Sequence, residues 1–444
     1  MVSSLHDPKS SKPLVDSATN SNKIISDKQS LYVTDALTPG SVFFLPHGTR
    51  IFNKLLGFMR SQQRKFGFEE VVTPLIYKQQ LWEKSGHWEN YKDDMFQVDG
   101  TDVSHEHYGL KPMNCPGHCI MFDKLDRSHN ELPIRFSDFS PLHRNEASGA
   151  LSGLTRVRRF HQDDGHIFCR PDQVGAEISS SLALVDLVYR VFNLPSYRLV
   201  LSTRPENYIG SLEDWNRAEA DLKQCLDNNY GENWQLNEGD GAFYGPKIDI
   251  LLKDHTGKEH QTATIQLDFQ LPVRFDLKFR GPSLANESSS SAIFIPEDQM
   301  SRPVLIHRAV FGSLERFLSI LIDHYNGKWP FWLSPRHALV VPVAERHINY
   351  AQQVVDRLSG KTDIDLPVNL ASDYFHIEMD SRAESIGLRL KNARQKGYNY
   401  VIVIGDAEVE SGLLPVKKQG EKVAKNMSVK QAFEMFVDLE KKFL

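Results

Sequence analysis

The sequence predicts an α+β fold followed by a separate C-terminal α/β domain, and two patterns support this prediction. Residues 240–271 hold two runs in which apolar and polar residues alternate, as in a β-hairpin. After Ser334-Pro335 the pattern changes to strands and helices in alternation, with buried-strand runs at residues 337–343 and 400–404. We therefore expect one domain over residues 31–333 and a second over residues 334–444.

Composition narrows the class of protein before any motif is considered. The chain has 444 residues, enough for two to four domains, and a formal net charge of -5, which excludes a uniformly basic nucleic-acid coat. No apolar run approaches the ~18 residues that a membrane span needs. Four cysteines are too few for a disulfide framework in a chain of this length, so a reducing compartment is favoured: Cys115, Cys119, Cys169 and Cys225.

The first half of the chain predicts a tail, a helix and several strands. Residues 1–30 are rich in Ser, Lys and Asn and are expected to form a disordered tail. Residues 50–66 have helical spacing of apolar side chains, and residues 69–76 read as a strand that ends near Pro74. Residues 137–168 predict strands that are joined by a long loop.

The second half predicts an insertion and a long helix. Residues 281–302 contain four consecutive serines between prolines and are interpreted as an inserted, exposed loop. Residues 306–325 place their apolar side chains on one stripe, which predicts a single helix. From Ser381 onward there are 12 Lys or Arg against 8 Asp or Glu, so the C-terminal end is the basic part of an otherwise acidic chain.

Charged residues crowd into residues 139–168, and two readings of that crowding remain open. One is a solvated, charged hairpin. The other is a binding site. Phe139 and Phe168 predict strands at both ends of the segment, so the charged side chains between them would face a cavity or a ligand. Arginine forks suit phosphate oxygens, and Phe160 could stack on a base. Gly-x-Gly-x-x-Gly and Walker patterns are absent, so a nucleotide would be held in another way.

Two further segments hold candidate chemistry. Cys115 lies in a turn formed by Pro112, Pro116 and Gly117, where a lone cysteine is usually a small buried side chain but is also able to join scattered ligands of a catalytic zinc. Arg316 lies beside the apolar stripe of residues 306–325. It is either a surface arginine in a salt bridge or an arginine at the edge of a pocket, with Gly312 allowing a flat ligand to approach.

Together these segments resemble the class II aminoacyl-tRNA synthetases, and specifically the threonyl-tRNA synthetase family, over about residues 31–444. The three class motifs are matched by residues 67–74, 143–160 and 312–316. The threonyl branch is matched by Lys111-Pro-Met-Asn-Cys-Pro-Gly-His118, Gln162-Asp-Asp-Gly-His166, Phe243-Tyr-Gly-Pro-Lys-Ile-Asp249, Ile265-Gln-Leu-Asp-Phe269 and Ile306-His-Arg-Ala309. The resemblance implies an antiparallel sheet flanked by helices and a C-terminal anticodon-binding domain.

The resemblance also implies a set of ATP-binding residues. Arg144 would hold the α-phosphate, Glu146 would read the adenine amino group, and Arg156 would meet the γ-phosphate. Phe160 and Arg316 would sandwich the adenine, with Arg144 and Arg316 catalytic and Mg²⁺ accompanying ATP. Ser313 would join the same site. Gln261 and Thr264 are placed for the ribose, although strict alternation sets Gln261 and Gln266 on opposite faces of a strand.

The implied amino-acid site contains a metal. Cys115, His166 and His307 correspond to the zinc ligands of the family, and one Zn²⁺ per chain would select threonine over valine by its hydroxyl group. The remaining residues expected around the bound threonine are Gln162, Asp164, Tyr244 and Gln266. Serine keeps that hydroxyl, so we hypothesise that the enzyme activates serine measurably and clears it by adenylate hydrolysis or through a separate protein.

The implied partners are tRNA(Thr), ATP, threonine and a second copy of the chain, which would pair through the motif around Pro74. The family's Arg-x-Arg pattern is replaced here by Pro415-Val-Lys-Lys-Gln419, which changes how the anticodon would be read. The candidate residues on the anticodon side are Arg382, Glu408, Lys417 and Lys418. Because the catalytic domain follows a short tail without room for an editing domain, we expect a mitochondrial-type enzyme located in the matrix.

Three alternatives to a threonyl-tRNA synthetase make different demands on the sequence. A catalytically silent paralogue that binds RNA as a regulator would usually have lost a motif arginine or a metal ligand. A zinc hydrolase would carry a pattern such as His-Glu-x-x-His, which is absent. A serine or proline synthetase would lack the Cys115, His166 and His307 trio.

Overall fold

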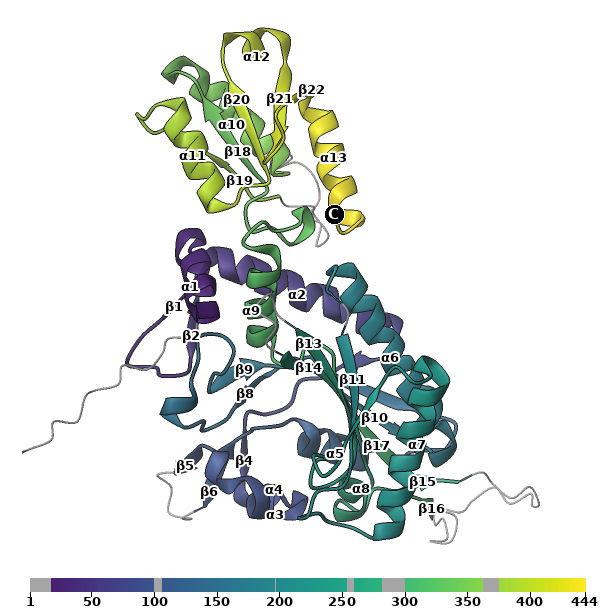
Figure 1. Ribbon diagram of the computed structural model, residues 1–444. Coiled ribbons are helices and arrows are strands. Elements are labelled where there is room, and N and C mark those ends of the chain that lie inside the picture. Colours follow the sequence, from purple (N-terminus) through teal and green to yellow (C-terminus); the bar gives the residue numbers. More distant parts are fainter. Residues whose placement is uncertain (1–16, 100–105, 196, 254–258, 282–299, 362–374) are drawn as a thin grey trace, which may run out of the picture.

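The computed structural model describes residues 17–99, 106–195, 197–253, 259–281, 300–361 and 375–444. It consists of a larger unit built on a broad sheet and a smaller C-terminal unit above it (Figure 1). None of the helices in these ranges combines the length and the apolar character that a membrane crossing requires.

The larger unit is organised by an eight-stranded sheet. Its order is β12 (Gln235–Asn237), β11 (Tyr197–Ser202), β13 (Lys247–Lys253), β14 (Glu259–Asp268), β17 (Val304–Ala309), β10 (Asp164–Cys169), β7 (Ile134–Asp138) and β3 (Glu69–Glu70). Neighbouring strands are antiparallel except at the two edges, where β11 pairs with β12 and β3 pairs with β7 in parallel. The predicted α+β fold with an antiparallel sheet is therefore confirmed, and the predicted hairpin is β13–β14.

One face of this sheet is buried under helices. Its apolar residues, such as Ile250, Ile265 and Ile306, share one core with α2 (Pro46–Lys65), α6 (Val174–Val191), α7 (Leu212–Tyr230) and α9 (Leu314–Tyr325). Because side chains alternate along a strand, the neighbouring residues Thr264, Gln266 and His307 point to the other face. The fold thus presents a polar floor on a rigid, well-packed support.

Smaller elements surround the polar face. Three two-stranded ribbons are formed by β1 (Tyr32–Thr34) and β2 (Val42–Phe44), by β8 (Pro141–His143) and β9 (Arg159–His161), and by β15 (Phe279–Arg280) and β16 (Met300–Ser301). A three-stranded sheet contains β4 (Ile76–Lys78), β6 (His107–Leu110) and β5 (Gln97–Asp99). The short helices are α3 (Gln79–Ser85), α4 (His87–Tyr91), α5 (Cys115–Asp123) and α8 (Gln270–Arg274).

The predicted helix over residues 306–325 is wrong in its first half. Residues 304–309 form β17, and the chain turns before α9 begins at Leu314. The turn has two physical causes. Gly312 has φ +64°, and the backbone N–H groups of Val310 and Phe311 donate to the Asp163 carboxylate at 2.9 Å each instead of entering a helix.

Two other expectations also need correction. The strand expected over residues 69–76 is interrupted: β3 ends at Glu70 and β4 begins only at Ile76, because Pro74 lies between them and lacks an N–H for a ladder. Of the tail expected over residues 1–30, residues 17–29 form the helix α1 (Ser17–Gln29). Most of the predicted insertion, residues 282–299, lies outside the described residues, and its end Met300–Ser301 is the strand β16.

Helix α1 lies at the junction of the two units. Asn22 Nδ2 donates to the Ser319 carbonyl of α9 at 2.8 Å, and Gln29 Nε2 donates to the Gly327 carbonyl at 2.6 Å. Arg336 Nη1 donates in turn to the Gln29 carbonyl at 2.8 Å. Long-range hydrogen bonds of this kind explain why a polar, serine-rich segment is ordered: its polar groups are satisfied by the fold.

The C-terminal unit is a five-stranded sheet with helices. Its order is β19 (Ile377–Met379), β18 (Ala338–Pro342), β20 (Tyr400–Ile404), β21 (Leu413–Lys418) and β22 (Lys425–Ser428). Strands β19, β18 and β20 are parallel to one another, β21 is antiparallel to β20, and β22 is antiparallel to β21. The helices are α10 (Ile348–Leu358), α11 (Ile386–Lys396), α12 (Asp406–Ser411) and α13 (Val429–Lys441), so the predicted α/β alternation is present.

Candidate active site

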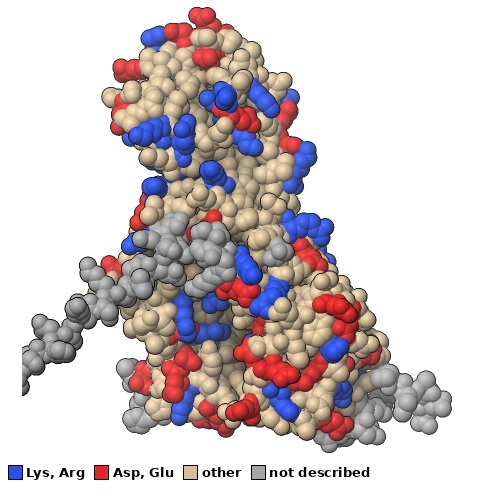
Figure 2. Space-filling view, in the orientation of Figure 1, with Lys and Arg blue, Asp and Glu red and all other residues tan. Residues whose placement is uncertain are grey.

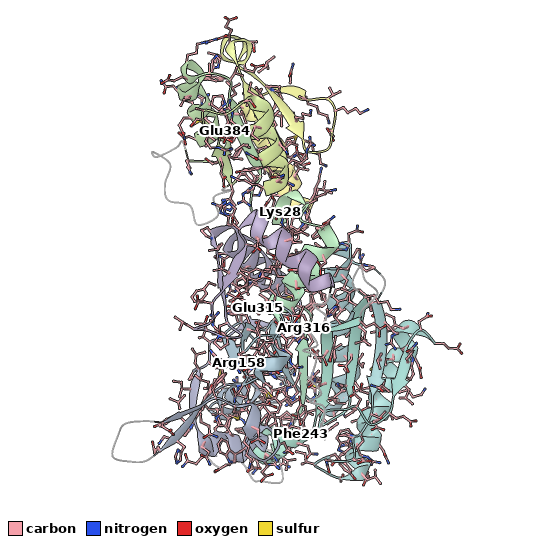
Figure 3. The ribbon with its side chains drawn as sticks, turned by 60° about the vertical axis from the view of Figure 1, so that its left-hand side comes forward. Lys28, Arg158, Phe243, Glu315, Arg316 and Glu384 are labelled. Carbon is pink, nitrogen blue, oxygen red and sulfur yellow. The ribbon has the colours of Figure 1, made fainter. Side chains whose placement is uncertain are left out.

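A cavity of about 220 Å³ opens on the polar face of the large sheet. It is lined by all eight residues that the resemblance assigns to ATP, and by Gln162 and Gln266 as well. Figure 2 shows Lys and Arg side chains inside a hollow of the larger unit, and Figure 3 shows Arg316 in the middle of that unit. The cavity therefore combines a polar floor with positive charge.

Arg144 and Phe160 form one wall of the cavity. The Arg144 guanidinium lies over the Phe160 ring, with 5.0 Å from Cζ to the ring centroid. Phe160 belongs to β9 and packs with Leu142 and Val157, so its ring is fixed in place. Glu146 lies near the mouth, where its carboxylate accepts from Arg156 Nε at 2.8 Å. An anion and a flat ring are the ligands that such a wall suits.

Arg316 forms the opposite wall, in the first turn of α9. Its Nε donates to the Thr155 carbonyl at 3.0 Å, and Ser313 caps the helix by accepting from the Arg316 backbone N–H at 3.2 Å. Burial lowers the pKa of Arg316, and the nearby positive charges of Arg144 and Arg156 lower it further. Since three guanidinium groups repel one another here, a polyphosphate between them would relieve that repulsion.

The position of Gln261 corrects the prediction made from strict alternation. Strand β14 has a register shift opposite Ile250 and Leu251, so that Ala263 pairs with Ile250 while Gln261 pairs with Leu251. This β-bulge turns Gln261 onto the same face as Thr264 and Gln266. Gln261 Nε2 and Thr264 Oγ1 donate to the same carboxylate oxygen of Asp249, at 2.5 and 3.1 Å.

The residues expected around threonine lie further along the same floor. The Asn114 side-chain N–H donates to Asp164 Oδ2 at 3.0 Å, and the Tyr244 hydroxyl donates to Gln266 Oε1. Burial raises the pKa of Asp164, although His118, Asn114 and His307 oppose that shift. Gln162 pairs with Ser313 through a backbone bridge, which connects this part of the floor to the ATP-side cavity.

Three buried donors converge beside Asp164. One ligand atom from each of Cys115, His166 and His307 lies within 4.8 Å of the other two. The register explains the meeting of the histidines, since His166 on β10 is directly opposite His307 on β17. Cys115 enters from the first turn of α5. A thiolate and two imidazoles are donors that Zn²⁺ prefers, and three protein ligands are typical of catalytic rather than structural zinc.

Burial sets the protonation of these donors. Burial raises the pKa of the Cys115 thiol, as do the charges of Asp164 and Asp268, so a cation is needed to favour the thiolate. Burial lowers the pKa of His166, as do His118 and His307, so its imidazole is neutral, which is the form that binds metals. The donor set therefore fits a zinc ion.

Sequence reasoning did not single out the residues behind the histidines. His307 Nε2 donates to Asp268 Oδ2 at 2.9 Å, and His118 Nδ1 lies 2.8 Å from His166 Nδ1. Asp138 lies behind His118. His118 and Asp268 fall inside matched blocks of the sequence, but only the three-dimensional structure shows that His118 contacts His166 and that Asp268 contacts His307.

The anticodon-side candidates lie apart from this site, in the C-terminal unit. Arg382 is paired with Asp380 at 2.7 Å and with Glu384 at 3.3 Å. Glu408 accepts from the Gly405 backbone N–H at 2.8 Å and so caps α12. Lys417 and Lys418 are exposed at the end of β21. Of the four, these two lysines have the side chains best placed to meet a phosphate.

Comparison with known proteins gives consistent matches. Residues 96–325 match the model of the tRNA synthetase class II core domain (G, H, P, S and T), and residues 337–439 match an anticodon binding domain. The mitochondrial threonine–tRNA ligase of Saccharomyces cerevisiae is 52% identical over 95% of this chain and 91% of its own length. A probable mitochondrial threonine–tRNA ligase of Schizosaccharomyces pombe is 51% identical over 95% and 90%.

A solved structure agrees. The crystal structure of the RNA binding domain of threonyl-tRNA synthetase from Cryptosporidium parvum superposes with a TM-score of 0.85 at 40% identity, over 94% of this chain and 98% of that one.

Proposed function

The chain belongs to the threonyl-tRNA synthetase family of class II aminoacyl-tRNA synthetases, and we propose that it attaches threonine to tRNA(Thr) by way of a threonyl-adenylate. The single observation that best supports this is that the cavity lined by three arginines lies on the same sheet face as the buried Cys115, His166 and His307 cluster. Gln266, which lines the cavity, is directly opposite His307 in the strand pairing. One part suits ATP and the other suits a small polar amino acid.

In the first step, the threonine carboxylate attacks the α-phosphorus of ATP, the bond to the β-phosphate breaks, and pyrophosphate leaves. Arg144 and Arg316 stabilise the charge that develops on the phosphate, with ATP bound together with Mg²⁺. Phe160 and the Arg316 guanidinium hold the adenine between them, while Gln261 and Thr264 contact the ribose. The chain's contribution is mainly positioning and electrostatic stabilisation, because no protein nucleophile is required.

In the second step, a ribose hydroxyl at the 3′ end of the tRNA attacks the adenylate carbonyl and AMP leaves. Earlier, when ATP binds before the first step, Glu146, which accepts from Arg156 at 2.8 Å, becomes free to read the adenine amino group as Arg156 turns to the γ-phosphate. Lys417 and Lys418 lie in the basic stretch that begins at Ser381, where a tRNA backbone would be attracted.

Amino-acid selection is proposed to depend on zinc. Cys115, His166 and His307 would hold the ion, and the ion would supply Lewis-acid coordination that engages the amino and hydroxyl groups of threonine. Asp164, Tyr244, Gln162 and Gln266 would enclose the amino acid. A site built around a hydroxyl rejects an analogue without it by ~10⁴-fold or more, which is why valine would be excluded.

A homodimer is proposed through the segment around Pro74. Three apolar side chains of this segment are exposed, with Val72 83%, Leu75 39% and Ile76 48% accessible. Exposed apolar side chains that lie close together in one segment are a feature of protein interaction surfaces. The mitochondrial names of the two similar ligases support a location in mitochondria, and we propose the matrix.

Aminoacylation of fractionated tRNAs tests the proposal. The purified chain should charge tRNA(Thr) with threonine, and should charge neither tRNA(Pro) with proline nor tRNA(Ser) with serine. A chain that binds tRNA(Thr) but transfers no amino acid would instead be a silent paralogue, and the proposed function would be wrong.

A further inference from the structure

Beyond the three donors, a buried row of side chains leads away from His166. His118 Nδ1 lies 2.8 Å from His166 Nδ1, and the two rings meet edge to face with their centroids 4.7 Å apart. On its far side, His118 Nε2 lies 3.7 Å from Asp138 Oδ2. All three residues are almost fully buried, so water does not compete for these contacts.

The Asp138 carboxylate is held firmly at the end of this row. Its Oδ1 accepts from the Ser140 backbone N–H at 2.7 Å, and its Oδ2 accepts from Thr73 Oγ1 at 2.7 Å. The buried Lys111 ammonium lies 3.6 Å from the same oxygen and donates to Thr73 Oγ1 at 2.7 Å. Asp138 is thus a fixed anion that faces His118.

The proton positions follow from hydrogen-bond chemistry. For His166 to offer Nε2 as a metal ligand, its proton must be on Nδ1, and the atom that faces Nδ1 is His118 Nδ1. His118 must then accept at Nδ1 and carry its own proton on Nε2. That buried nitrogen has no hydrogen-bond partner within the residues that the structure describes, and its nearest anion is Asp138.

His307, the other histidine of the cluster, also contacts a buried carboxylate, but directly and without an intervening imidazole. His307 Nε2 donates directly to the buried Asp268 carboxylate at 2.9 Å, which leaves the lone pair on Nδ1, the atom that faces His166 Nε2 at 2.9 Å. Each histidine of the cluster therefore ends at a buried carboxylate, one directly and one through a second imidazole. Partners of this kind orient metal-binding histidines in many proteins.

We infer that His118 and Asp138 are positioning residues that hold His166 in the tautomer and orientation in which its Nε2 binds the metal. The inference rests on the proposed metal site at Cys115, His166 and His307. It adds two residues that do not touch threonine, ATP or the metal. It also links the site to Thr73, which directly precedes Pro74 in the proposed dimer segment.

Metal affinity of the full chain tests the inference without any activity assay. Co²⁺ is titrated into the metal-free protein and followed by its visible absorption, and Zn²⁺ affinity is measured by competition with a chromophoric chelator. His118→Phe should raise the Zn²⁺ dissociation constant by about 10- to 100-fold while one ion per chain still binds at saturation. His118→Gln should restore most of the affinity, because its amide oxygen can accept from His166 Nδ1–H. Asp138→Asn should have a Zn²⁺ affinity between those of His118→Phe and His118→Gln.

The control is His337→Phe, which removes an equally buried imidazole from the C-terminal unit and should leave the affinity unchanged. An affinity of H118F within twofold of the unmutated protein would overturn the inference, as would loss of the Co²⁺ absorption at saturation, since His118 would then be a ligand itself. Should H118F not fold, H118Q and D138N carry the same comparison. If the unmutated protein binds no metal, the proposed zinc site fails together with the inference.

Discussion

At the scale of single residues, the proposed selectivity depends on the hydroxyl group that threonine shares with serine and that valine lacks. Asp164, Tyr244 and Gln266 lie beside the Cys115, His166 and His307 cluster and offer oxygen and N–H groups instead of an apolar pocket. Such a site distinguishes hydrogen-bonding groups well and a single methyl poorly, because one methylene is worth only ~1–3 kcal/mol.

This predicts different outcomes for the two analogues. In amino-acid-dependent ATP–pyrophosphate exchange, valine should be activated ~10⁴-fold less efficiently than threonine, and serine only ~10- to 200-fold less. Charging of tRNA(Thr) with radiolabelled serine gives the complementary measurement. If serine were rejected as completely as valine, the pocket would discriminate by the methyl group of threonine. The hypothesis that the enzyme activates serine measurably would then be refuted.

At the scale of elements, the start of α9 sets the position of Arg316. The helix begins at Leu314 because Gly312 turns the chain and the Ser313 hydroxyl accepts from the Arg316 backbone N–H. A Cβ at residue 312 would lie 2.4 Å from the Thr262 carbonyl, so glycine is required there for space as well as for its positive φ.

The cap can be tested by substitution. Ser313→Ala should lower the free energy of unfolding by about 1 kcal/mol in urea denaturation, whereas Ser313→Thr, which keeps a capping hydroxyl, should remain close to the unmutated protein. Equal stability of the two variants would mean that the hydroxyl contributes no cap.

The hairpin and the second sheet were predictable from the sequence, whereas strand β17 was not. Alternation in residues 240–271 and the shift of pattern at Ser334 predicted the hairpin and the second sheet, because burial on one face leaves a visible period. Residues 306–309 were misread as helix because a short apolar run suits both a buried strand and a helix, and what decides is the Asp163 carboxylate that takes the next two N–H groups.

The floor of the site was predictable only in part, for a related reason. The identity of Gln261 and Thr264 was readable from the matched blocks, but the β-bulge between them depends on pairing with β13, which no local pattern records. Likewise His118 on α5 and Asp138 on β7 meet only through the packing of that helix against the sheet. Contacts between distant segments are what the sequence alone did not specify.

At the scale of the whole molecule, the proposed homodimer depends on the exposed apolar segment around Pro74. Val72 is the most exposed apolar residue of the segment around Pro74, so a charge there should disrupt a dimer that uses this surface. Val72→Asp should shift the protein from dimer to monomer in analytical ultracentrifugation at micromolar concentration. Val423→Asp, which alters a valine of similar exposure (75%) in the C-terminal unit, away from the segment around Pro74, should leave the dimer intact. A dimeric V72D would place the interface elsewhere.

The junction of the two units also has a pH dependence. Burial lowers the pKa of His47 to about 4, helped by the charges of Arg336 and Arg50, and burial with Arg50 and Lys54 lowers the pKa of His376 to about 4. Because an unfolded histidine has a pKa near 6.5, these groups contribute stability that is full above that value and is lost as the pH falls from 6.5 towards 4.

The pH dependence is measured as a difference between variants. When the pH is lowered from 6.5 to 4.5, the melting temperature should fall in both proteins. The fall should be a few degrees smaller for His376→Gln than for the unmutated protein. His107→Gln, which replaces a histidine with a side chain 66% exposed, serves as the matched control and should follow the unmutated curve. Parallel curves for all three proteins would show that His376 is not buried in its neutral form.

The three arginines around the cavity and the Cys115, His166 and His307 cluster are proposed to form one site for ATP and threonine. Threonine-dependent ATP–pyrophosphate exchange, with zinc quantified on the same sample, measures both parts of that site together. We predict exchange that requires threonine, about one zinc per chain, and a loss of ~10²- to 10³-fold in kcat in Arg316→Ala with the zinc retained. Zinc-loaded protein that catalyses no exchange with threonine would show that the arginines and the Cys115, His166 and His307 cluster do not form one site for ATP and threonine.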